Sequence, residues 1–172
     1  MRYKLIVGLG NPGKEYVNTY HNAGFIALNF LTGDGRYKKH GLFEYVKSGV
    51  VVFVKPLTYM NESGAAVSQA LRFFKKEAGD LLIIHDDTDI PLGERRLSCN
   101  RGSAGHNGVK SIIESLGTKE FCRLRIGIRL PEHKGKAGEV VLRKIRRSER
   151  VVIEKAIKNS ADELGILPSS AS

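Results

Sequence analysis

The sequence predicts an α/β fold: a single domain with a twisted, mostly parallel mixed sheet and helices on both faces. Two observations carry this prediction. Apolar segments at residues 3–9 and 81–84 are typical of buried strands, and each is followed along the chain by a segment with apolar residues at helical spacing. Strands that alternate with helices in this way form a largely parallel sheet that is covered on both sides.

The first half of the chain contains four of the predicted elements. Residues 3–9 form an apolar run that a Gly/Pro turn closes, which is typical of a buried strand. Residues 21–31 carry apolar side chains close to helical period, so a helix is expected to begin near Asn22. Residues 43–54 contain a β-branched run interrupted by a glycine and predict one or two strands. Residues 61–76 again have helical period.

The second half continues the alternation. Its predicted segments are a strand at residues 81–84, a glycine-rich stretch at 102–108, a helix at 109–116, a strand at 122–129 and a charged helix at 148–164. We expect Asp86 to lie at the carboxyl end of the first of these strands. Residues 167–172 are small and polar and are expected to be a disordered tail, which leaves residues 1–166 as the domain.

The bulk composition is that of a globular protein. A chain of 172 residues buries roughly 70% of its unfolded surface on folding. The two cysteines, Cys99 and Cys122, are too few for a disulfide framework and are expected to be free thiols in a reducing compartment. The apolar run near the N-terminus is too short for a signal peptide or a bilayer span, so we expect a cytoplasmic protein without a membrane partner.

The positive charge is concentrated in one half of the chain. Of the formal net charge of +10, residues 1–90 contribute 11 basic and 9 acidic side chains, and residues 91–172 contribute 17 and 9. Such a surplus attracts polyanions and speeds their capture. Nucleic acid or an anionic surface is therefore a candidate partner, although a merely soluble basic surface would have the same composition.

The glycine motif after the first strand leaves a cofactor alternative open. Residues 8–13, Gly-Leu-Gly-Asn-Pro-Gly, match the dinucleotide fingerprint of nicotinamide and flavin proteins. That fingerprint needs a helix to begin inside the glycine turn, so that its amides can hold a pyrophosphate. Here the helical pattern starts only near Asn22, and the expected acidic residue after a second strand is missing, so the match is weak.

A histidine and a carboxylate are the leading candidates for chemistry. His21 stands just ahead of a predicted helix, and an imidazole can take a proton from water near neutral pH when a carboxylate orients it. Asp86 is the candidate carboxylate. In a sheet of this class Asn11, Asp86, Asn61 and Asn107 could meet at one rim. The structural alternatives are a helix cap or surface residue for His21, a solvated turn acid for Asp86 and a helix N-cap for Asn61.

Other reaction types have less support. Asp86, Asp87 and Asp89 raise the question of a metal, but no phosphate-cradling loop accompanies them, so no metal is predicted. The Gly-x-Ser-x-Gly nucleophile pattern is absent, and neither cysteine neighbours a histidine in sequence. Water activated by a histidine, with asparagine amides to orient a carbonyl, remains. A non-catalytic RNA-binding module is a rival class, although the chain lacks its interleaved aromatic motif.

Several sequence blocks, taken in order, resemble the bacterial peptidyl-tRNA hydrolase family from about Lys4 to Leu164. The matching blocks are residues 8–13, Tyr16 with residues 19–25, residues 55–56, 60–64, 85–87 and 105–108, and Phe121 with residues 123–127. The resemblance implies a monomeric α/β enzyme without metal or organic cofactor. It also implies a substrate, peptidyl-tRNA released prematurely from ribosomes, whose ester bond is hydrolysed.

The resemblance also implies roles for individual residues. By position, His21 resembles the catalytic base, and Asn11 and Asp86 resemble the residues that position it. The residues that resemble contacts to the peptide and the tRNA 3′ end are Tyr16, Tyr59, Asn61 and Asn107. Arg125 resembles a basic residue that grips the tRNA 5′ phosphate.

The chain departs from the family pattern at two places. Ser98 stands where many relatives have a lysine, so Arg95, Arg96 or Arg101 would have to supply the missing contact to the phosphate. Residues 32–42 are short compared with many members, which is expected to trim a surface loop.

Overall fold

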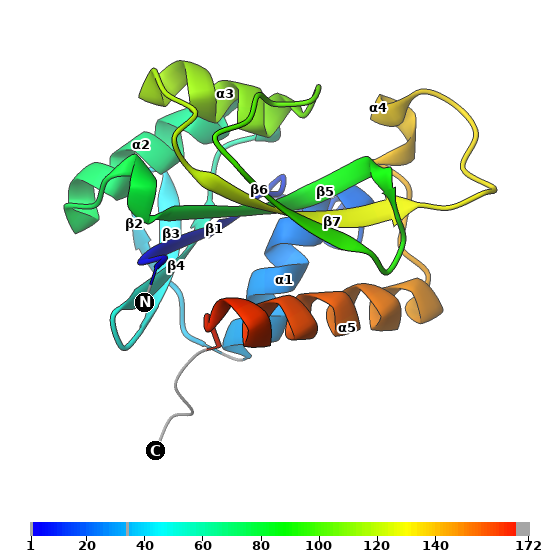
Figure 1. Cartoon of the computed structure of the whole chain (residues 1–172), viewed down its shortest axis with the longest axis horizontal. Helices are drawn as coiled ribbons and strands as arrows, with labels where there is room; N and C mark the ends of the chain where they lie inside the picture. Colours follow the sequence, from blue (N-terminus) through cyan, green and yellow to red (C-terminus); the bar gives the residue numbers. More distant parts are fainter. Residues whose placement is uncertain (1, 34, 168–172) are drawn as a thin grey trace.

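The structure, a computed structural model, describes residues 2–33 and 35–167 and shows one seven-stranded mixed sheet between helices (Figure 1). From edge to edge the strands are β2 (Lys38–His40), β3 (Phe43–Ser48), β4 (Val51–Pro56), β1 (Leu5–Gly8), β5 (Leu81–Pro91), β7 (Cys122–Arg129) and β6 (Arg95–Cys99). The four strands β4, β1, β5 and β7 are parallel, whereas β2, β3 and β6 pair antiparallel with their neighbours. The predicted α/β fold with a mixed sheet is confirmed.

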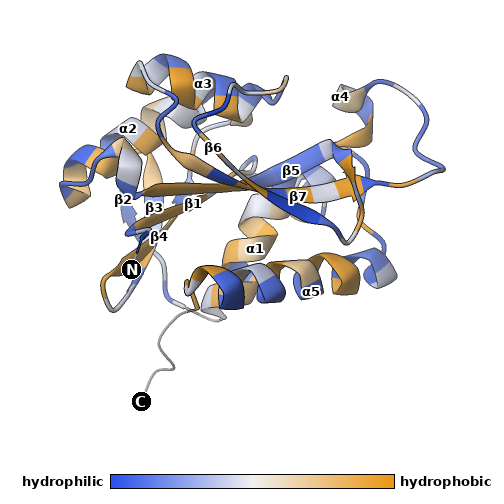
Figure 2. Ribbon diagram, viewed as in Figure 1, coloured by the Kyte–Doolittle hydropathy of each residue, from blue (hydrophilic) through white to orange (hydrophobic). Residues whose placement is uncertain are grey.

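Helices cover both faces of this sheet, as Figure 1 shows. Helices α1 (Ala23–Thr32) and α5 (Arg147–Leu164) share one apolar cluster with Ile6, and α2 (Ser63–Phe74) and α3 (Asn107–Leu116) share the other with Leu5 and Val7. Successive strand residues face opposite sides, so the all-apolar β1 supplies both clusters. The colouring in Figure 2 follows this pattern, with apolar helix faces turned toward the strands. The short helical segments are η1 (Tyr20–Asn22), η2 (Met60–Glu62), η3 (Ala78–Asp80) and α4 (Ala137–Val140).

Two glycines of the sequence motifs bring α1 directly against the sheet. A Cβ atom on Gly8 would lie 2.2 Å from the Gly24 carbonyl oxygen, and one on Gly24 would lie 2.4 Å from the carbonyl oxygen of Ile84. Only glycine allows this approach of backbone to backbone. Because α1 begins at Ala23, no helix starts inside the 8–13 turn. Gly8 therefore serves helix packing, and the geometry of a dinucleotide site is missing.

The described structure differs from the sequence-based elements in four places. Strand β5 continues to Pro91, so Asp86 lies inside the strand and does not end it. The pattern also did not predict β2, β6 and α4, which have 3, 5 and 4 residues. Segments as short as these contain too few residues for an apolar period to be recognised.

The expectation of free thiols is wrong. Cys99 and Cys122 lie opposite each other on the antiparallel pair β6 and β7, with their Cα atoms 4.1 Å apart, and they form a disulfide. Their separation of 23 residues contains no information about this pairing. It becomes visible only when β6, which the sequence did not predict, is placed beside β7.

Two further expectations concern the chain as a whole. No described helix is both long and apolar enough to cross a bilayer. Of the expected tail at residues 167–172, only Leu167 is among the described residues, so the expectation for residues 168–172 lies outside them.

Candidate active site

A cavity of about 300 Å³ opens beside the middle of β5. Three elements deliver its polar residues: η1 carries His21, β5 carries Asp86, and the start of α3 carries His106 and Asn107. Segment 137–141 closes one wall, where the backbone N–H of His21 donates to the Val141 carbonyl at 2.8 Å. Of the four residues expected to meet at one rim, Asp86 and Asn107 line this cavity, together with His21, whereas Asn11 and Asn61 do not.

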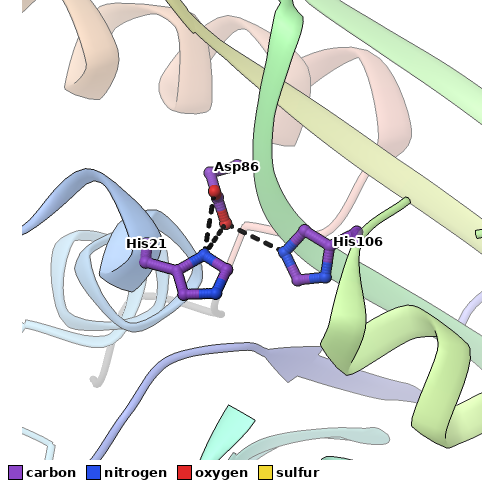
Figure 3. Close-up of side chains that lie close together, drawn as sticks. All are labelled: His21, Asp86 and His106. Carbon is purple, nitrogen blue, oxygen red and sulfur yellow. Dashed lines mark hydrogen bonds and ion pairs between the residues drawn. The ribbon is translucent and has the colours of Figure 1, made fainter. Parts of the chain in front are cut away.

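His21 and Asp86 both line the cavity, and their side chains point toward each other (Figure 3). The Nδ1 atom of His21 lies 3.0 Å from each of the two carboxylate oxygens of Asp86. The Asp86 side chain is 2% exposed and that of His21 is 13% exposed. Since Nδ1 faces the carboxylate, Nε2 is the ring nitrogen that remains for a water molecule or a substrate.

The electrostatics of this pair favour an ionised carboxylate and a basic imidazole. Burial raises the pKa of Asp86, but the charges and hydrogen bonds of His21 and His106 outweigh it, so the net pKa is well below its ordinary value. Burial likewise lowers the pKa of His21, but the charge and hydrogen bond of Asp86 together raise it above its ordinary value. Asp86 is thus a fixed negative charge that stabilises the protonated form of His21.

His106 is a site residue that the sequence reasoning did not single out. Its Nε2 lies 3.0 Å from Asp86 Oδ1, and its Nδ1 accepts the backbone N–H of Val109 at 3.3 Å as the N-cap of α3. Because Nδ1 accepts, the proton is on Nε2 and is donated to Asp86. The nearby sequence signal was the Gly-His-Asn-Gly block before a helix, which is also typical of a flexible loop.

The same three side chains have the composition of a metal site. Their possible ligand atoms all lie within 4.8 Å of one another. However, a neutral histidine that binds a metal through Nε2 carries its proton on Nδ1. At His106 that proton would oppose the Val109 N–H, so metal binding would break the helix cap. The three side chains therefore fit a hydrogen-bonded cluster around Asp86 better than a metal centre.

Asn11 reaches the site through the backbone around His21. Its backbone N–H donates to Asn22 Oδ1 at 2.8 Å, and Asn22 Nδ2 donates back to the Asn11 carbonyl at 3.0 Å. The side-chain oxygen of Asn11 accepts the N–H of Met60 at 2.7 Å, which joins the turn after β1 to η2. Asn11 thus fixes the segment that carries His21, and its Nδ2 amide is the group it can offer to a ligand. Asn22 is a second residue that sequence reasoning did not assign.

The remaining predicted contacts lie around the cavity and do not line it. Tyr59 is 53% exposed, Asn61 is exposed within η2, and Tyr16 lies in the turn before η1. Asn61 is not the N-cap that the structural alternative proposed, since Tyr59 caps η2 and Glu62 caps α2. None of these three is among the residues that line the cavity.

Arg125 lies on β7 next to the cavity wall and is partly engaged within the protein. Its Nε donates to Asp87 Oδ2 at 2.7 Å and its Nη1 donates to Ser98 Oγ at 3.3 Å. Its neighbour across the strand pair is Arg96, which is exposed. The departure from the family pattern at Ser98 therefore lies directly at Arg125, on a strand pair rich in arginine.

Comparisons with known proteins agree with this fold. The family model described as peptidyl-tRNA hydrolase matches residues 5–171. The peptidyl-tRNA hydrolase of Mycoplasma capricolum is 43% identical over 168 residues, which cover 92% of this chain and 89% of that protein. That of Lactobacillus johnsonii is 49% identical over 138 residues, covering 76% and 74%. The crystal structure of peptidyl-tRNA hydrolase from Acinetobacter baumannii superposes with a TM-score of 0.84 at 35% identity and covers 96% of this chain and 88% of that one. The chain belongs to the peptidyl-tRNA hydrolase family.

Proposed function

We propose that this protein hydrolyses the ester bond between a peptide, or an N-blocked aminoacyl group, and the 3′ end of tRNA, using water that His21 activates. The observation that carries the proposal is the placement of His21 Nδ1 at 3.0 Å from both oxygens of a buried, ionised Asp86. This contact keeps the proton on Nδ1 and leaves Nε2 as a base toward the cavity.

The reaction would proceed in two steps. A water molecule gives a proton to His21 Nε2, and its oxygen forms a bond with the ester carbonyl carbon. Asp86 stabilises the resulting imidazolium, and amide groups of Asn11, Asn61 and Asn107 share the negative charge on the carbonyl oxygen. The bond to the tRNA ribose oxygen then breaks, and that oxygen receives the proton from Nε2. The products are a peptide with a free carboxyl group and a tRNA.

The basic strand pair β6 and β7 is the proposed binding surface for the tRNA body. Arg125 and Arg96 face each other across this pair, and Arg101 comes shortly after β6 in the chain. Tyr16 and Tyr59 are proposed to contact the substrate near the ester.

The direct test is hydrolysis of a peptidyl-tRNA or N-blocked aminoacyl-tRNA with a chelator present and no nucleotide added. Release of free tRNA is expected. Binding of the substrate without release would favour a non-catalytic RNA-binding protein. A requirement for an added nicotinamide or flavin would favour the dinucleotide alternative. Hydrolysis that the chelator abolishes would replace the histidine base with metal-activated water.

A further inference from the structure

Among the described residues, no carboxylate lies within ion-pair distance of a buried arginine behind the cavity. Arg123 on β7 is 2% exposed, and within the described residues it forms no ion pair. Its two terminal nitrogens have neutral acceptors instead: Nη1 lies 3.2 Å from His85 Nε2, and Nη2 donates to the Gly102 carbonyl at 2.7 Å. Burial and the charge of Arg125 lower the pKa of Arg123, and the charge of Asp87 offsets this only in part, so the burial of this cation calls for a function.

The arginine determines where the proton of His85 lies. A guanidinium only donates hydrogen bonds, so His85 Nε2 must accept, and the proton of the neutral ring is on Nδ1. That Nδ1 lies 2.6 Å from the backbone carbonyl oxygen of Asp86, to which it donates a hydrogen bond. Burial, the neighbouring His106 and then Arg123 lower the pKa of His85 well below its ordinary value, so the ring stays neutral. His85 is therefore held in one tautomer between Arg123 and the backbone of Asp86.

His85 in turn supports the second partner of the catalytic carboxylate. Its ring packs edge to face on His106, with the ring centroids 4.4 Å apart. His106 donates from Nε2 to Asp86 Oδ1. The other contact of Arg123, the Gly102 carbonyl, lies at the start of the loop that leads to His106. Arg123 thus holds that loop at its beginning and, through His85, supports it at its end.

We propose that Arg123 and His85 are positioning residues that keep His106 hydrogen-bonded to Asp86 and thereby set the basicity of His21. The kinetic test of this proposal rests on the proposed function, because its readout is hydrolysis; the geometric part of the proposal does not. The titratable and charged groups around the Asp86 carboxylate are His21, His106 and His85, with Arg123 behind His85. Asp87 is paired with Arg125.

The sign of the effect follows from the shared carboxylate. While His106 donates to Asp86, part of the negative charge of Asp86 is engaged away from His21. If His106 moves away, Asp86 bonds His21 alone and holds its proton more strongly. His21 then remains protonated to higher pH, where it cannot act as a base. The acid limb of the kcat/KM profile should therefore move to higher pH.

The test uses the full chain with the conservative change Arg123→Lys. One ammonium nitrogen keeps the charge but is not expected to reach both His85 and Gly102. We expect kcat to fall on the order of tenfold, as for other residues that orient a reactive group. KM should change little, and the acid limb should rise. Val67→Ala, on the buried face of α2, is the matched control: it should lower stability and leave the acid limb in place.

A second measurement needs neither a variant nor turnover. Histidine side-chain NMR of the unmodified protein should show His85 protonated at Nδ1 and His106 at Nε2 at neutral pH. His85 protonated at Nε2 would overturn the proposal. A folded Arg123→Lys variant with an unmoved acid limb would also overturn it, whether or not kcat falls. If the unmodified protein fails to cleave peptidyl-tRNA, the proposed function fails, and the NMR result still decides this inference.

Discussion

At the residue scale, the strongest expectation concerns His21. His21→Ala removes the proposed base, so kcat should fall by about 10² to 10⁴ with little change in KM. Because the removed side chain is only partly buried, the unfolding temperature should also change little. Steady-state hydrolysis measures kcat and KM, and a thermal unfolding scan measures the unfolding temperature. His40→Ala is the control, because His40 lies on the edge strand β2 and should keep full activity. Retention of most activity in His21→Ala would remove this residue from the mechanism.

Asp86, the carboxylate partner of His21, should determine how kcat/KM depends on pH. Because Asp86 raises the pKa of His21 above 6.5, the acid limb of the kcat/KM profile should lie above that value. Asp86→Asn removes the raising charge while burial continues to lower the pKa, so the limb should move to lower pH. The maximal rate should also fall, less severely than in His21→Ala, because the imidazolium loses its countercharge. A limb in the same place in both proteins would show that the pairing does not control His21.

The sequence predicted the centre of the site but not its full set of contacts. Asp86 could be paired with His21 and placed on one rim with Asn107, because each of these residues adjoins the end or start of a predicted element. His106 could not, because its role depends on the path of a glycine-rich loop and on which ring nitrogen accepts the Val109 amide. Arg123 was visible only as part of the predicted strand at residues 122–129 and of the family-like block at residues 123–127. Its burial against His85 is a consequence of β5 and β7 pairing, which no local pattern encodes.

At the element scale, apolar period located β7 and α5 but missed the edge strands of the sheet and the second half of β5. The strand at residues 122–129 and the helix at residues 148–164 agree with β7 and α5 within one residue. Strands β2 and β6 lie at the two edges; every residue of β2 is exposed, and no residue of β6 is buried. A strand without a buried face shows no alternation of apolar and polar residues, so it cannot be distinguished from a loop.

The disulfide gives a prediction at this scale, since it joins the edge strand β6 to β7. Closing a loop of this length, with a separation of 23 residues, should stabilise the fold by about 3 kcal/mol. Urea denaturation with and without a reductant should show this loss in the free energy of unfolding. Cys99→Ala should have the lower stability without reductant, and the reductant should not lower it further. Equal stability of the unmodified protein in both conditions would mean that the bond does not constrain the chain.

Arg125, on β7, connects the site to the proposed tRNA surface. Arg125→Ala should raise KM for full-length peptidyl-tRNA much more than it lowers kcat, because an arginine that binds a phosphate holds the substrate without taking part in bond breaking. The pair with Asp87 is partly buried, so the variant also needs a stability measurement. A short substrate without the tRNA body should be cleaved equally by both proteins. Equal impairment with both substrates would place Arg125 in the active site or the fold.

At the scale of the whole molecule, the excess of basic side chains lies in the second half of the chain. Residues 91–172, which contain β6 and β7, carry 17 basic and 9 acidic side chains of the chain's total. Arg95 on β6 is ion-paired with Glu163, whereas Arg96 is exposed opposite Arg125. Arg96 is therefore the better candidate for the phosphate interaction that Ser98 does not provide.

The salt dependence of tRNA binding tests this asymmetry. Cations that bind phosphates release counterions, so removing one phosphate-binding side chain should flatten the slope of log affinity against log salt by roughly 0.7 to 0.9. Arg96→Ala should flatten it by that amount, and the double change Arg95→Ala with Arg96→Ala should weaken binding further. Lys39→Ala removes the same charge from β2, at the opposite edge of the sheet, and serves as the control. If tRNA binds across β6 and β7, the control keeps the original slope. If both single variants flatten the slope equally, net charge governs binding, and this strand pair is not the tRNA surface.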